Sequence, residues 1–60
     1  MDELLKLLEN VPDKYDDFIR GMYVTLKNDE DNRQKVIMYI KDHPDAKSDD
    51  VIEYLDELGI

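Results

Sequence analysis

The sequence predicts an all-α fold, a small orthogonal or antiparallel bundle of four helices in which the first is short and the third is central. Two observations support this. Apolar residues recur at helical spacing in four segments, and Pro, Gly, Asn or Asp punctuates the chain between them. With 60 residues, the chain is long enough for one domain, and we expect residues 1–60 to form a single helical unit.

The first helix is short. Asp2 can cap its N-terminus, and Pro12 closes it because the residue before a proline is biased away from helix. One apolar stripe runs along it, formed by Leu4, Leu7, Leu8 and Val11. A helix this short is marginal in water, so it must dock its leucines on the rest of the chain.

The second helix is expected from about Asp13, with Pro12 or Asp13 as its start signal. Its apolar stripe follows i, i+3, i+4, i+7 and i+11 spacing and consists of Tyr15, Phe18, Ile19, Met22 and Leu26. Gly21 lies in the middle and costs roughly 1 kcal/mol relative to Ala. Gly21 therefore indicates either close approach of a neighbouring helix, which we favour, or a bend.

The third helix covers Arg33–His43 and holds the longest apolar run, Val36 to Ile40. Read alone, that run could be a buried strand, but its polar flanks extend past normal strand length without a turn signal. Asn28 or Asp29 is expected to cap the helix, and Pro44 stops it. We assign Val36, Ile37 and Ile40 to the core, whereas Met38 and Tyr39 point elsewhere.

The last helix is expected to start at Ser48 as its N-cap, with two aspartates in the first turn. Its apolar residues are Val51, Ile52, Tyr54, Leu55 and Leu58. Gly59 fits the C′ position, and Ile60 can then fold back on Leu55 in a Schellman motif.

The formal charge of −8 excludes some partners and favours others. An acidic surface repels phosphate backbones and anionic membranes, so a basic protein or peptide is the better electrostatic partner, although acidity also simply keeps a small domain in solution. No apolar run approaches the roughly 20 residues of a membrane span, and the acidic N-terminus does not resemble a signal peptide. Together with the absence of Cys, these features lead us to expect a cytoplasmic protein.

Chemistry-bearing residues are few. His43 and Ser48 are the only His and Ser, and with Asp42 or Asp45 they would sit on a loop and at helix ends, without an evident oxyanion site. Asn28 to Asp31 lacks the glycine and the closing glutamate of a calcium loop, and one His without Cys does not make a closed zinc site. We therefore expect no enzyme activity, no cofactor, no metal and no small-molecule substrate.

The order helix, loop, Ser48-capped helix and turn after Arg33 resembles the first two helices of a winged-helix or helix-turn-helix domain. The resemblance covers about the last half of the chain, and the chain stops where the recognition helix should begin. It implies, as an alternative function, a regulator of nucleic-acid transactions, either as a degenerate helix-turn-helix or as an acidic DNA mimic. Direct nucleic-acid binding is not expected from so acidic a chain.

The most informative feature for function is that the chain has more large apolar residues than a small bundle can bury. A bundle this small is nearly all surface, so some large apolar side chains must stay partly exposed. The residues that we expect to form a partner interface lie on the second apolar faces of the third and last helices: Met38, Tyr39, Ile52 and Tyr54. Aromatic residues and Met are enriched in interfaces, although tyrosines also lie at core edges with their hydroxyls in water. The leading prediction is a non-catalytic protein-interaction or small regulatory module, acting on a protein partner or on itself as a homodimer.

Overall fold

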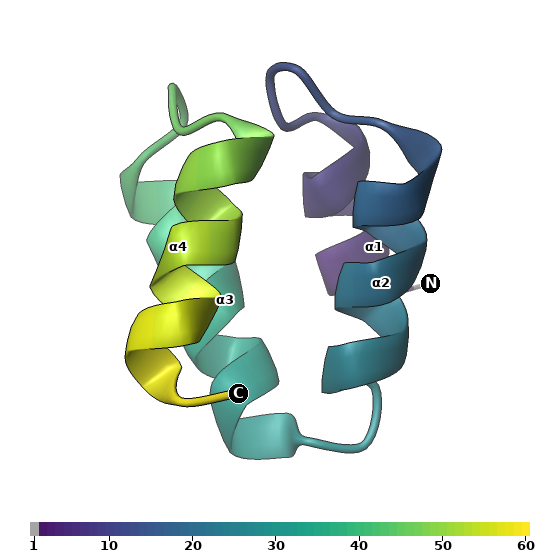
Figure 1. Cartoon of the computed structure of the whole chain (residues 1–60), viewed down its shortest axis with the longest axis vertical. Helices are drawn as coiled ribbons and strands as arrows, with labels where there is room; N and C mark the ends of the chain where they lie inside the picture. Colours follow the sequence, from purple (N-terminus) through teal and green to yellow (C-terminus); the bar gives the residue numbers. More distant parts are fainter. Residues whose placement is uncertain (1) are drawn as a thin grey trace.

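Residues 2–60, the part of the chain that the computed structural model describes, fold into four helices and contain no strand. The helices are α1 (Glu3–Glu9), α2 (Asp16–Leu26), α3 (Glu30–Asp42) and α4 (Ser48–Leu58). Successive helices run in opposite directions, with α1 beside α2 and α3 beside α4 (Figure 1). Because α3 also packs against α1 and α2, it is the central helix, and the predicted fold class is confirmed.

The start of α1 follows its sequence signals. The Asp2 carboxylate accepts a hydrogen bond from the Leu4 backbone N–H at 3.0 Å and satisfies one of the free donors at the helix start. The helix ends at Glu9, and Asn10 caps it through backbone bonds. Leu4 and Leu8 are fully buried, so this short helix is held by packing.

The predicted start of α2 at Asp13 is wrong, because the helix begins at Asp16. Asp13 has a φ of 61°, in the left-handed region, which a right-handed helix cannot contain. Tyr15 is extended and precedes the first helical residue. The residues after Pro12 therefore form a loop that lets α2 reverse direction against α1.

Helix α3 begins where an aspartate can cap it, as predicted. The Asp29 carboxylate accepts from the Asn32 backbone N–H at 3.3 Å and from the Asn32 side-chain amide at 2.8 Å. The strand alternative for the apolar run is wrong, since Val36, Ile37 and Ile40 lie inside one continuous helix. All three are buried, as predicted.

Ser48 is not the N-cap of α4 as predicted, because it is the first residue inside the helix. Its buried hydroxyl donates to the Asp13 carbonyl at 3.1 Å, and its backbone N–H donates to the Pro12 carbonyl at 3.2 Å. The Lys47 backbone N–H is instead satisfied by the Asp50 carboxylate at 3.1 Å. Ser48 thus ties the start of α4 to the loop between α1 and α2, which lies at the same end of the molecule (Figure 1).

The predicted Schellman ending of α4 is confirmed. Gly59 has a φ of 80°, which glycine adopts without the steric penalty of a Cβ atom. The Gly59 N–H donates to the Asp56 carbonyl at 3.1 Å, and the Ile60 N–H donates to the Leu55 carbonyl at 3.3 Å. These two bonds satisfy carbonyls that the helix end leaves free.

All four helices contribute to one apolar core. Its buried side chains are Leu4, Leu8, Val11, Phe18, Met22, Leu26, Val36, Ile37, Ile40 and Val51. Burial of each large aliphatic or aromatic side chain contributes about 1.5–3 kcal/mol before the loss of chain entropy is subtracted. Within residues 2–60, no helix is long and apolar enough to cross a membrane.

Candidate functional site

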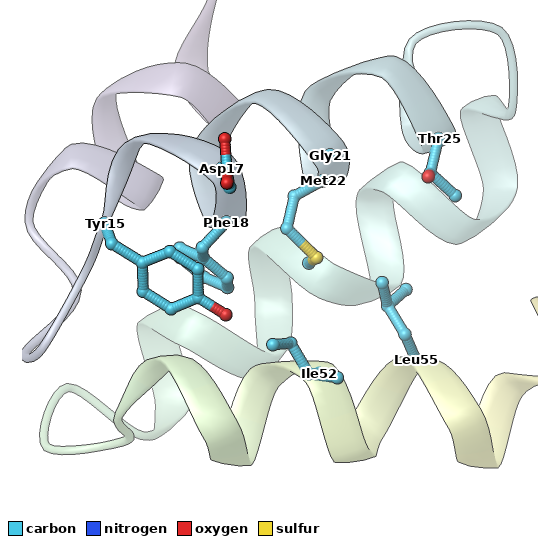
Figure 2. A pocket seen from close by; sticks show the side chains of 8 residues that line it. All are labelled: Tyr15, Asp17, Phe18, Gly21, Met22, Thr25, Ile52 and Leu55. Carbon is cyan, nitrogen blue, oxygen red and sulfur yellow. The ribbon is translucent and has the colours of Figure 1, made fainter.

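An apolar groove runs between α2 and α4. Figure 2 shows Tyr15 and Phe18 at one end, Thr25 at the other, and Ile52 and Leu55 reaching up from α4. The full lining is Tyr15, Asp17, Phe18, Gly21, Met22, Thr25, Ile52 and Leu55. The groove has a volume of about 240 Å³ and is open to solvent.

The groove follows from the arrangement of the helices. Both α2 and α4 pack on α3, but they make at most a weak contact with each other. Helices in close contact lie about 8–10 Å apart and interlock their side chains. Because the contact between α2 and α4 is weak at most, α3 forms the support beneath two helix flanks that remain separate.

The floor and the walls of the groove differ in exposure. Phe18 and Met22 are only 3% and 4% exposed and belong to the core. Tyr15 and Ile52 are 49% and 37% exposed and stand at the edges. The Tyr15 and Phe18 rings form a tilted pair with centroids 5.8 Å apart, so the aromatic end of the groove is held in place from the core outwards.

Gly21 leaves a gap in the α2 wall. A Cβ atom built on it would meet nothing within 4 Å, so the predicted close approach of a neighbouring helix is wrong. Its φ is not positive, so its backbone conformation does not require glycine either. Within the described chain, neither packing nor conformation demands a glycine at this position.

The structure separates the four residues predicted to form an interface. Tyr39 and Tyr54 stack on one another with ring centroids 4.3 Å apart and an interplanar angle of 10°. Ile52 lies on the other flank of α4, about 160° from Tyr54 at 100° per residue, and lines the groove. Met38 is 59% exposed on α3. The Tyr39–Tyr54 pair and the groove are therefore two surfaces, and the interface role of these residues stays a prediction.

A second, polar hollow lies beside Tyr39 and His43, whose rings are 4.6 Å apart. Its lining includes the carboxylates of Asp42, Asp45 and Asp50. The pKa of the Tyr39 phenol is raised above its usual 10.0. The largest cause is partial removal of the phenol from water, and nearby negative charges, that of Asp50 above all, raise the pKa further. The phenol therefore stays protonated at neutral pH and can donate a hydrogen bond.

The residues considered for catalysis are not assembled into a reactive group. The Ser48 hydroxyl is buried and donates to the Asp13 carbonyl, so it does not face His43 as an activated nucleophile. Asp42 and Asp45 line the hollow at His43, but Ser48 does not. Among residues 2–60, no three His, Asp or Glu side chains converge in a way that could hold a metal ion.

No protein-family model, curated protein or solved structure matches this chain.

Of the residues that line the groove, only Ile52 is predicted from the sequence as a surface residue. The predicted core stripe of the second helix includes Tyr15, Phe18 and Met22. Phe18 and Met22 are buried as predicted, and they also form the floor of the groove, which helical spacing does not indicate. The signal that could have pointed to the groove was Gly21, a glycine in the middle of an amphipathic helix.

Proposed function

We propose that this chain is a non-catalytic protein-interaction module that binds a helical segment of a partner protein in the groove between α2 and α4. The observation that carries the proposal is the open apolar groove with a gap at Gly21. Amphipathic helices commonly dock in such grooves, with apolar anchors at helical spacing.

The dimensions of the groove favour a protein side chain over a small molecule. Sites for drug-sized ligands enclose about 300–1,000 Å³ and bury most of the ligand. A groove of about 240 Å³ that is open along one side accommodates one or two anchoring side chains instead. We further propose a cytoplasmic location, supported by the acidic composition and the absence of Cys.

Pull-down from an extract of the source cells tests this function with three baits: the intact chain, Gly21→Trp and Gly21→Ala. A tryptophan at position 21 enters open space and fills the groove, whereas alanine leaves most of the groove open. A direct partner should be retained by the intact chain and by Gly21→Ala, and be lost with Gly21→Trp. Thermal denaturation of each bait confirms that all three are folded.

The outcome that contradicts the groove as binding surface is a specific partner retained equally by all three baits. A fourth bait, Tyr39→Asp, places a charge in the Tyr39–Tyr54 stack on the other flank of α4. A partner lost only with Tyr39→Asp would assign the interaction to that surface, as the sequence predicts.

Self-association is the second form of the proposal and would use the exposed Met38 of α3 together with the half-buried Tyr39–Tyr54 pair, outside the groove. Met38, 59% exposed, supports it. Sedimentation of the intact chain well above micromolar concentration tests it, because a homodimer of 60-residue chains doubles the mass. A monomer throughout that range would contradict the homodimer without affecting the groove.

A further inference from the structure

We infer that the occupant of the α2–α4 groove is a basic amphipathic helix, with one bulky apolar anchor opposite Gly21 and Lys or Arg on both of its flanks. This inference rests on the proposed function of the groove and names the chemistry of its partner. It is carried by the charges that border the groove.

The α4 border of the groove is acidic. The sequence of α4 contains five acidic residues and no basic residue. Ile52, which lines the groove, has Asp49 three residues before it and Asp56 four residues after it, so all three share one face of the helix. Both aspartates are exposed. One bank of the groove therefore presents an apolar side chain between two carboxylates.

The α2 border of the groove is also negatively charged. Asp17 lines the groove one helical turn before Gly21 and is exposed. Arg20 is the only basic residue of α2; it lies three residues after Asp17 and, like Asp49 and Asp56, is not part of the lining. A helix lying in the groove would thus meet carboxylates on both sides of its apolar contact, and Lys or Arg on its flanks would complement them.

A second copy of this chain does not fit the groove. Each copy carries a charge of −8. A second copy lying in the groove would therefore bring further carboxylates towards Asp17, which lines it. Like charges brought together at an interface oppose association. An uncharged helix would gain the apolar contact but leave the acidic borders without partners.

Gly21 locates the anchor. It is exposed, and a Cβ atom at this position would meet nothing within 4 Å. Met22 and Phe18 provide an apolar floor beside it, and Ile52 provides the opposite wall (Figure 2). A Leu, Phe or Trp side chain of the partner can therefore enter between the helices at this point, where a side chain on α2 would otherwise block it.

The test uses three labelled synthetic amphipathic helices with the same leucine positions and with Lys, Gln or Glu at all the other positions. Fluorescence anisotropy measures their binding to the intact 60-residue protein. We expect the Lys peptide to bind at least about tenfold more tightly than the Glu peptide, with the Gln peptide between them. Raising the salt concentration from about 0.1 M to about 1 M shortens the Debye length from about 10 Å to about 3 Å and should reduce the advantage of the Lys peptide over the Gln peptide.

Two variants separate the charge from the groove. Gly21→Trp should weaken binding of the Lys peptide about tenfold or more, and Gly21→Ala is its matched control. The triple variant Asp17→Asn, Asp49→Asn, Asp56→Asn should weaken the Lys peptide about fivefold and leave the Gln peptide unchanged.

The failures are distinguishable. Equal binding of the Lys, Gln and Glu peptides, all lost with Gly21→Trp, overturns the basic partner and leaves the groove function standing. Binding of the Lys peptide that Gly21→Trp does not weaken shows attraction to the acidic surface in general and overturns the basic helix as groove occupant, while the pull-down decides the groove function. If no peptide binds the intact protein, the inference of a basic helix is overturned, and the pull-down decides the groove function separately.

Discussion

Replacement of Gly21 by alanine should stabilise the protein. Gly21 lies in the middle of α2, is exposed, and has nothing within 4 Å of the position that a Cβ atom would take. In a helix interior glycine is less favourable than alanine by about 1 kcal/mol, because it loses more backbone entropy on folding. With no clash to offset this gain, Gly21→Ala should raise the free energy of unfolding by about 1 kcal/mol. For a domain of this size that corresponds to an increase of about 4–8 °C in Tm.

Gly59 provides a matched control in the same chain. A Cβ atom at Gly59 would also meet nothing within 4 Å, but its φ is 80°. A non-glycine residue in the left-handed region costs about 1–2 kcal/mol. Gly59→Ala should therefore lower the free energy of unfolding by about 1 kcal/mol, so that the same chemical change has opposite signs at the two positions.

The assay is urea denaturation of the intact protein and of both variants, followed by circular dichroism. Equal m values would show that only stability has changed. A Gly21→Ala variant that is no more stable than the intact protein would refute the reasoning, because α2 would then need the freedom of glycine at this position. Such a result would favour the bend that the sequence left open as the alternative. A stabilised variant would instead agree with a glycine that neither packing nor backbone conformation requires.

Three further substitutions test contacts within the fold. Ser48→Ala should lower the free energy of unfolding by about 1–3 kcal/mol, measured by urea denaturation, because it leaves the Asp13 carbonyl without its buried donor. Asp29→Ala should lower the free energy of unfolding by about 1 kcal/mol in the same assay, because it removes the cap of α3. It should also reduce the protection of the first amides of α3 from hydrogen exchange, and unchanged protection would contradict the cap. Since folding raises the pKa of Tyr39, the native state holds the phenol proton more tightly than the unfolded state. This group should not affect stability below about pH 10, and stability should fall as the pH rises through the raised pKa. In denaturation experiments at alkaline pH, Tyr39→Phe should remove that part of the loss of stability.

The nucleic-acid alternative remains a prediction with a direct measurement. A degenerate helix-turn-helix would bind DNA at low salt, and an acidic mimic would compete with DNA for a basic protein. Titration of labelled duplex DNA with the intact chain, at about 50 mM salt, tests the first form. A basic DNA-binding protein added to the same duplex, with and without the intact chain, tests the second. If neither binding nor competition is observed, this function is removed.

Local signals predicted much of the fold because they act over one turn of helix. Asp2 and Asp29 cap their helices through hydrogen bonds to residues two or three positions away. Gly59 ends α4 through bonds that span five residues at most. Val36 and Ile40 are core residues because they lie on one face of the same helix. Spacing and residue type are sufficient for such interactions.

The errors arose where a distant segment competes with a local signal. Ser48 is a good N-cap by type, but its hydroxyl bonds to Asp13, which lies 35 residues away in the chain. Pro12 and Asp13 are good helix starters by type, but Asp13 takes a left-handed conformation in a loop that α4 contacts. The residue pattern of one segment gives no information about its contacts with the other segment.

The sequence by itself determined four helices, most of their ends, and the buried face of the central one, because periodicity and capping depend on neighbours within a turn. Only the tertiary structure decided that α2 and α4 stand apart on α3 and that Gly21 and Ile52 face the same groove. It also decided that Tyr39 and Tyr54 stack away from it. The position of one helix flank relative to another depends on how all the core side chains fill space together. The spacing of apolar residues within a single helix does not determine that packing.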